Sequence, residues 1–102
     1  MDIIVGTELK INVNVEPFGD THLEDCYFEC IFYVKKSRAQ LIKKEDMIRQ
    51  DKDNYVALVD SAKLGPGRLL LKISVYVPDM DFGDANRKEV DLLWTGVTLI
   101  DA

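Results

Sequence analysis

Two cysteines and one histidine are the residues of this sequence whose types and spacing first suggest chemistry. Cys26 and Cys30 are four positions apart, and the histidine is His22. If both cysteines lie on one strand, their Cα atoms are roughly 13 Å apart. A disulfide needs a Cα separation below about 7 Å, so the two thiols cannot bridge there. We therefore predict two buried apolar side chains and a reducing, cytoplasmic compartment.

The remaining reactive residues indicate neither a hydrolase nor a zinc site. A catalytic serine or cysteine needs a base beside it, and His22 lies in a turn-like stretch. The serines, Ser37, Ser61 and Ser74, lack the flanking glycines of a nucleophile elbow. A zinc site would need more ligands than two cysteines and one histidine supply. We expect no enzymatic activity and no cofactor.

Residues 79–84 form an acidic loop with three aspartates, the kind of cluster that hard cations such as Ca²⁺ prefer. The spacing departs from an EF-hand loop, because Asp84 stands where a glycine is required and Val90 where a glutamate is required. Arg87 and Lys88 are close enough in sequence to neutralise the carboxylates. A solvated acidic loop and a weak cation site both remain open.

The chain has a net charge of −5, and its charges are unevenly distributed. Residues 1–34 hold one base and seven acids, residues 35–52 seven bases and three acids, and residues 53–102 five bases and eight acids. The acidic balance argues against a general nucleic-acid binder. The basic segment has two interpretations: lysines that protect an edge strand from foreign sheets, or one flank of a polar subunit that meets the acidic flank of another copy.

Aromatic residues accompany the basic segment and recur later in the chain. Aromatic side chains on both faces of a strand can complete a core, form a carbohydrate platform or form a protein interface. We favour the core or self-assembly. The candidate interface residues are Tyr27, Tyr33, Lys35, Lys36, Arg38, Lys43, Lys44, Tyr76 and Trp94.

Neither a membrane span nor a secretory signal is expected. The apolar run at residues 69–71 is far shorter than the roughly 20 residues that cross a membrane, and residues 1–6 lack a basic leader. We expect a soluble protein with neither a membrane, a nucleic acid nor a small-molecule substrate as its partner.

Apolar and polar residues alternate with a period of two along most of the chain, which indicates strands. The clearest segments are residues 7–15, 26–35, 55–60 and 68–77. Turn chemistry separates them at residues 17–20, 51–54 and 61–67. In the longest strand, the odd-numbered residues from Leu69 to Val77 are expected to face inward, whereas Lys72 and Ser74 face outward. Strand 26–35 has two apolar faces, which is typical of a central strand.

Two segments are less direct. Residues 39–50 fit a helical stripe, but also two short strands separated by Lys44-Glu45-Asp46, which we prefer. In residues 87–100 we expect Val90, Leu92 and Trp94 to face inward. The later inward residues are Val97 and Leu99, so the parity changes at Thr95-Gly96 and predicts a β-bulge there.

Seven or eight short strands in 102 residues predict one domain, an all-β, immunoglobulin-like antiparallel β-sandwich over residues 1–102. A small barrel is the alternative. The exterior of such a domain, rather than a cleft, would then be its working part.

A resemblance adds a functional hypothesis. The sequence reads GTEL at 6–9, LEDCYFECIFY at 23–33, YVALVD at 55–60 and LGPGRL at 64–69. It continues with PDMDF at 78–82, Arg87, Glu89, Val90, and TGV at 95–97. It resembles the small β-sandwich proteins of Bacteroides-type phages and prophages, which are similar to the N-terminal domain of phage baseplate upper proteins. The resemblance implies a tail or baseplate component without catalytic residues. Its partners would be copies of itself and other virion or tail proteins. It would be made in the host cytoplasm and carried in the virion.

Overall fold

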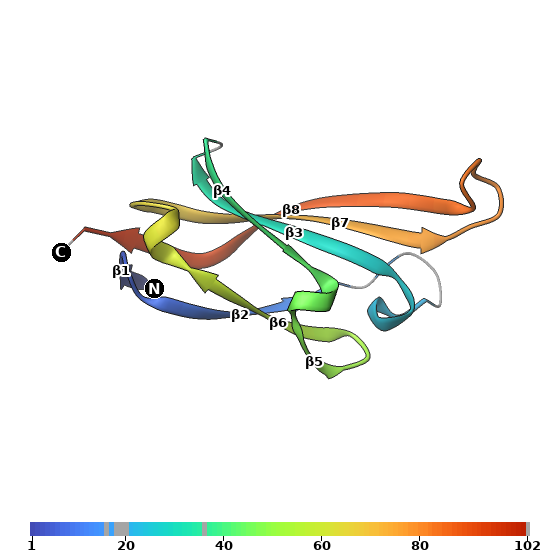
Figure 1. Cartoon of the computed structure of the whole chain (residues 1–102), viewed down its shortest axis with the longest axis horizontal. Coiled ribbons are helices and arrows are strands. Elements are labelled where there is room, and N and C mark those ends of the chain that lie inside the picture. Colours follow the sequence, from blue (N-terminus) through green and yellow to red (C-terminus); the bar gives the residue numbers. More distant parts are fainter. Residues whose placement is uncertain (16, 18–20, 36, 102) are drawn as a thin grey trace.

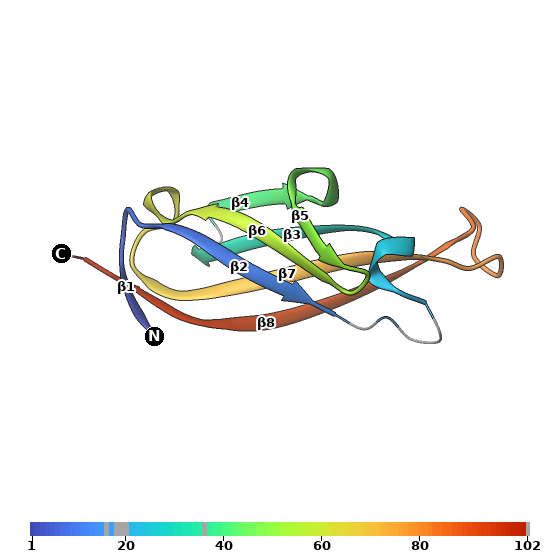
Figure 2. The same ribbon diagram turned by 90° about the horizontal axis from the view of Figure 1, so that it is seen from below.

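The chain folds into two β-sheets that pack against each other (Figures 1 and 2). The computed structural model describes residues 1–15, 17, 21–35 and 37–101. The larger sheet has the order β1-β8-β7-β3-β4, with β1 at Asp2–Ile4, β8 at Asn86–Ile100, β7 at Gly67–Pro78, β3 at Tyr27–Lys35 and β4 at Arg38–Lys43. The smaller sheet has the order β2-β6-β5, with β2 at Glu8–Asn14, β6 at Asn54–Asp60 and β5 at Ile48–Asp51. One-turn 3₁₀ helices lie at Leu23–Asp25 (η1), Lys44–Asp46 (η2) and Ser61–Lys63 (η3).

Each strand pair is antiparallel except β1 with β8, which is parallel. The all-β sandwich is therefore confirmed. The alternative of a small barrel is wrong, because the strands form two separate sheets. The strand order is compatible with an immunoglobulin-like topology, because β8, β7, β3 and β4 face β2, β6 and β5. That finer assignment stays a prediction.

The core lies between the sheets and is built from alternate residues of the strands. Phe28 and Phe32 of β3 are fully buried, and the Phe28 ring meets the Tyr55 ring edge to face, with centroids 4.9 Å apart. From β7, all five predicted inward residues are buried: Leu69, Leu71, Ile73, Val75 and Val77. The alternation of residues 7–15, 26–35, 55–60 and 68–77 is thus confirmed, with β3 paired on both sides as a central strand.

Residues 39–50 form two strands and not a helix. In each pair of adjacent apolar residues, one side chain is buried and its neighbour is exposed. Ile42 and Met47 lie in the core, whereas Leu41 and Ile48 are about half exposed. Opposite orientation of neighbours is the geometry of a strand, and η2 carries the chain from the larger sheet to the smaller one. The preferred interpretation is confirmed.

The expected orientation of the first half of β8 is wrong. Leu71, which faces the core, pairs with Leu93, so Leu92 and Trp94 point to the opposite side of the sheet. The bulge at Thr95-Gly96 exists: Gly96 has φ +83°, and the register shifts between Arg68 and Leu70. Between the two pairs that flank the bulge, β8 advances by four residues, from Trp94 to Thr98, whereas β7 advances by only two, from Arg68 to Leu70. Because β8 has two extra residues, an even number, the same side of the strand faces the core before and after the bulge, and the predicted change of parity does not occur. Val90, Leu92 and Trp94 therefore face outward, while Val97 and Leu99 are buried.

Two further predictions concerned Ser74 and the turn at residues 17–20. Ser74 faces outward as predicted, but it is buried, because it lies between Glu29 of β3 and Val90 of β8. Of the predicted turn at residues 17–20, only Pro17 belongs to the described residues, and it is buried. The turn prediction for residues 18–20 lies outside them.

Candidate interaction surface

The side of the larger sheet that faces away from the core gathers many of the exposed apolar side chains. Directly paired residues point to the same side of a sheet, so the register defines this surface. We call it the outer face and define it on four strands: Lys88, Val90, Leu92 and Trp94 of β8; Arg68, Leu70, Lys72, Ser74 and Tyr76 of β7; Tyr27, Glu29, Ile31 and Tyr33 of β3; and Ala39, Leu41 and Lys43 of β4.

Two neighbouring cross-strand rows form the centre of the outer face. One row runs Leu92, Lys72, Ile31, Leu41, and the next runs Trp94, Leu70, Tyr33, Ala39. Leu92 is 68% exposed, and Trp94 and Leu41 are about half exposed. Isolated exposed apolar residues are ordinary on protein surfaces, whereas a contiguous group across four strands is typical of an interaction site.

The four aromatic residues of the predicted interface come together on the outer face. Tyr27 and Tyr76 are cross-strand neighbours, with ring centroids 5.9 Å apart. Tyr33 pairs with Leu70, which in turn pairs with Trp94. Three strands that are distant in sequence therefore supply two aromatic pairs on one face, which lie roughly 20 Å apart along β3. The inward orientation expected for Trp94 is wrong, whereas the sequence had left open which face of residues 26–35 meets the core.

Basic groups surround these apolar side chains. The outer face carries four bases, Lys43, Arg68, Lys72 and Lys88, and one acid, Glu29. The Arg68 guanidinium lies 4.5 Å from the centre of the Trp94 ring, and the Lys88 ammonium lies 5.8 Å from that of Tyr76. The outer face of an acidic protein is therefore positively charged. Further acids lie at its margin: Asp25 lines a pocket together with Tyr27 and Tyr76, and Asp2 of β1 pairs with Thr98.

The predicted basic residues separate into distinct roles. Lys43 belongs to the outer face, opposite Glu29. Lys35 and Arg38 pair at the β3–β4 end of the sheet, where Arg38 lies against Gly65. The prediction for Lys36 lies outside the described residues.

Lys44 does not belong to the outer face, because its side chain is bonded to the backbone of an earlier segment. Its ammonium donates hydrogen bonds to the backbone oxygens of Glu24 at 2.7 Å and Cys26 at 2.6 Å. It also lies 5.8 Å from the centre of the Phe28 ring. Lys44 thus links η2 to η1 and to Cys26, which follows η1.

Five residues of the outer face were not among the candidates predicted from the sequence: Arg68, Leu70, Lys72, Val90 and Leu92. The pattern on which the prediction relied, the two-sided apolar character of residues 27–33, marks the same face. For β8 the alternation shows two faces, one with Arg87, Glu89 and Asp91 and one apolar, and the apolar face was assigned to the core. Only the pairing with β7 reverses that choice.

A second apolar surface is the groove between β2 and β8, at the open side of the sandwich. The groove has a volume of about 430 Å³. Its walls include Ile11 of β2 and Leu71, Leu93 and Val97 of the larger sheet. Leu93 faces the core side but is 41% exposed, because the smaller sheet does not cover it completely. Lys10 is the charged residue that lines this groove.

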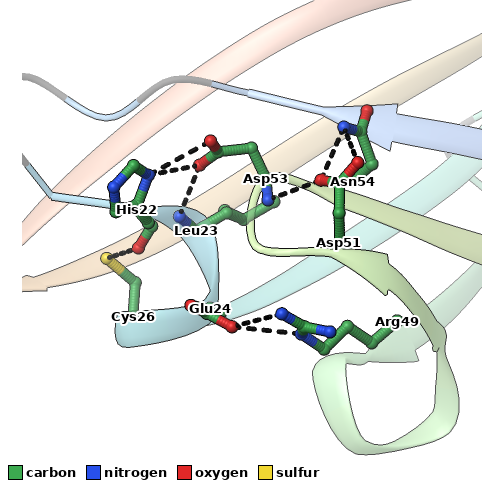
Figure 3. Close-up of polar contacts among 8 residues, drawn as sticks. All are labelled: His22, Leu23, Glu24, Cys26, Arg49, Asp51, Asp53 and Asn54. Atoms are coloured by element: carbon green, nitrogen blue, oxygen red, sulfur yellow. Dashed lines mark hydrogen bonds and ion pairs between the residues drawn. The ribbon is translucent and has the colours of Figure 1, made fainter.

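Cys26 and His22, which were considered for chemistry, lie close to Asp53 of the β5–β6 turn (Figure 3). Asp53 accepts hydrogen bonds from the Leu23 backbone N–H, and its carboxylate lies 3.1 Å from His22 Nδ1. The Cys26 thiol donates to the backbone oxygen of His22 at 3.5 Å rather than contacting the imidazole. Burial raises the pKa of Cys26. The arrangement orients η1 and does not activate the thiol.

A salt bridge strengthens the same junction. Arg49 of β5 donates two hydrogen bonds to Glu24 of η1, with an Nη2–Oε2 distance of 2.8 Å (Figure 3). On the adjoining β5–β6 turn, the Asp51 carboxylate accepts from Asn54 and from the Asp53 backbone N–H. These contacts explain why η1 packs on the β5–β6 hairpin.

Two carboxylates of the acidic loop at residues 79–84, those of Asp79 and Asp84, accept internal hydrogen bonds. Asp79 pairs with Arg87 at 2.9 Å, and Asp79, Asp81 and Asp84 are arranged in a turn in which aspartates accept from nearby backbone N–H groups. Within residues 1–15, 17, 21–35 and 37–101, no three histidine, cysteine, aspartate or glutamate side chains form a group that could hold a metal ion.

In the described part of the chain, no helix has the length and hydrophobicity that crossing a membrane requires. The sequence matches none of the protein-family models, curated proteins or solved structures with which it was compared. Functional inference therefore depends on the geometry of this molecule.

Proposed function

We propose that this protein is a non-catalytic structural subunit that works by burying the outer face of its larger sheet against another protein. The observation that carries the proposal is the group of apolar side chains on the outer face, which are exposed on β8 and β4 and, apart from the exposed Tyr27, half-buried on β7 and β3. Burial of apolar area contributes roughly 25 cal/mol per Å², so covering such a surface favours association. The surrounding bases then select the orientation and the charge of the partner.

The biological setting that we propose is the tail of a phage or prophage. The sequence resemblance to phage β-sandwich and baseplate proteins supports this setting. The compact fold and its exposed aromatic face suit a component whose output is an interface. Under this proposal, the partners are copies of the same chain and other tail proteins. Capsid and tail genes beside the coding gene are the expected result, and a neighbourhood without phage genes would count against the setting.

A second candidate is a carbohydrate- or receptor-binding module, which the exposure of Trp94 and Tyr27 favours. Sugars stack on open aromatic faces. Here Arg68 lies over the ring of Trp94, which leaves less of that ring for a sugar. The protein-interface proposal is therefore stronger.

The test uses Trp94, the single tryptophan of the chain, as a reporter on the outer face. Emission and acrylamide quenching are measured while the protein concentration is raised, and again after addition of the products of neighbouring genes. We expect a blue shift and slower quenching, because association removes the indole from water. A Lys72→Glu variant should need at least tenfold more protein to give the same blue shift.

Lys63→Glu is the matched control, because Lys63 is exposed on η3 and does not belong to the outer face. It should leave the response unchanged. Emission that stays constant under every protein condition contradicts the proposed function. A shift that only a glycan panel produces favours the second candidate instead.

A further inference from the structure

The loop that joins β7 to β8 displays a second exposed apolar surface. We call residues 79–85 the hairpin tip. Met80 is 87% exposed and Phe82 is 49% exposed. The tip is closed by its own backbone hydrogen bonds, from Asp79 N to Ala85 O at 2.9 Å and from Ala85 N to Phe82 O at 2.9 Å. It is therefore a shaped turn that presents two large apolar side chains to solvent.

The charge of the hairpin tip is opposite to that of the outer face. The tip carries three aspartates, of which Asp79 is paired with Arg87, while Asp81 and Asp84 are exposed. The outer face carries four bases and one acid. Apolar side chains flanked by acids on one surface thus match apolar side chains flanked by bases on the other.

The tip cannot reach the centre of the outer face of its own chain. It extends the larger sheet along the longest axis of the molecule, which measures 50 Å, and it points away from the body (Figure 1). Between Asn86 at the start of β8 and Trp94 the strand covers roughly 26 Å at 3.3 Å per residue. Contact between the two surfaces therefore requires two molecules.

We infer that the outer face binds the hairpin tip of a second copy of this chain. Met80 and Phe82 pack on the apolar rows around Leu92, and Asp81 and Asp84 face Lys72 and Lys43. The inference rests on the proposed function, to which it adds the identity of the partner. Because the two surfaces differ, a pair of copies keeps one free face and one free tip, and the contact repeats head to tail.

A symmetric dimer of two outer faces is the competing arrangement. It would place four bases and one acid of each copy against the same set in the other, and like charges in a closed interface are repulsive. The head-to-tail arrangement avoids this repulsion and also covers the exposed tip.

Two variants that each disable one surface test the inference by light scattering and sedimentation. In the wild-type chain we expect the mean mass to rise beyond two chains with concentration, and to fall in 1 M salt, where charges are screened within about 3 Å. Leu92→Ser and Phe82→Ser should each need at least tenfold more protein to associate. A one-to-one mixture should form a species of two chains and stop there, because one good tip meets one good face.

Leu58→Ser is the matched control, since Leu58 of the smaller sheet is 50% exposed, close to the 49% of Phe82. It should assemble like the wild-type chain, and circular dichroism should show that all variants fold. The inference is overturned if Phe82→Ser assembles normally, if the mixture yields no two-chain species, or if the wild-type chain stays a monomer. The proposed function survives these results if Trp94 still becomes buried with another protein, and fails only if it never does.

Discussion

Burial determines what the thiols of this protein can do. Cys30 is completely buried, and burial raises its pKa to about 12 from an ordinary value of 9.0. A thiol is nucleophilic as a thiolate, so Cys30 is inert at neutral pH. Cys26 and Cys30 are both unpaired, which agrees with the spacing argument and with their role as small apolar side chains.

The raised pKa of Cys30 makes stability depend on alkaline pH. Above pH 9 the unfolded chain loses a proton from this thiol while the folded chain keeps it until about pH 12. The free energy of unfolding should therefore fall with rising pH, by at most about 1.4 kcal/mol per pH unit from this group. Urea unfolding at pH 8, 9 and 10 measures the slope.

Cys30→Val should show a shallower slope in the same experiment, because valine does not ionise. Both chains retain Cys26, Tyr27 and Tyr55, whose pKa values are also raised by burial. The difference between the slopes thus isolates Cys30. Parallel slopes would show that burial of Cys30 has no such effect.

Lys44 illustrates a charged residue with a structural role. Lys44→Met removes the donor to the backbone oxygens of Glu24 and Cys26. We expect the free energy of unfolding to fall by about 1–3 kcal/mol, which is the cost of leaving half-buried polar groups unpaired. Lys43→Met on the exposed neighbour should change it by less than about 0.5 kcal/mol. Equal losses in denaturant titrations would contradict the assignment.

At the scale of the element, β8 changes its environment along its length. Its first half extends past the smaller sheet, and its second half lies in the core. Leu92→Ala should therefore cost less than about 1 kcal/mol, whereas Leu99→Ala should cost about 2–5 kcal/mol, because Leu99 is 1% exposed. Denaturant unfolding of the two variants measures this. A large loss for Leu92→Ala would restore the inward orientation that the alternation first indicated.

At the scale of the whole molecule, the hairpin tip is separable from the sandwich. Replacing residues 79–85 with Asn-Gly makes a tight turn between Pro78 and Asn86, the last pair of the β7–β8 ladder. The shortened chain should keep its circular dichroism and lose less than about 1 kcal/mol of stability. It should fail to assemble head to tail. A chain that unfolds would show that the tip supports the core.

The strands and turns were largely predictable because they depend on residues that are close together in the sequence. The alternation of Leu9 to Val13 and of Leu69 to Val77 located β2 and β7, and the turn chemistry at 51–54 located the β5–β6 hairpin. The opposite burial of Leu41 and Ile42 followed from the same rule once residues 39–50 were taken as strands. For Trp94 the same rule gave the wrong orientation, because the alternation does not say which face of a strand meets the core.

The amino-acid sequence by itself determined the strands, their turns and the all-β sandwich, since these depend on period-two patterns and turn residues that act over a few positions. The tertiary structure alone decided which side of β8 meets the core. A strand has two equivalent faces, and apolar character marks both a core and an interface. Only the pairing of Leu71 with Leu93, together with the limited extent of the smaller sheet, determines which face is covered and which is left exposed.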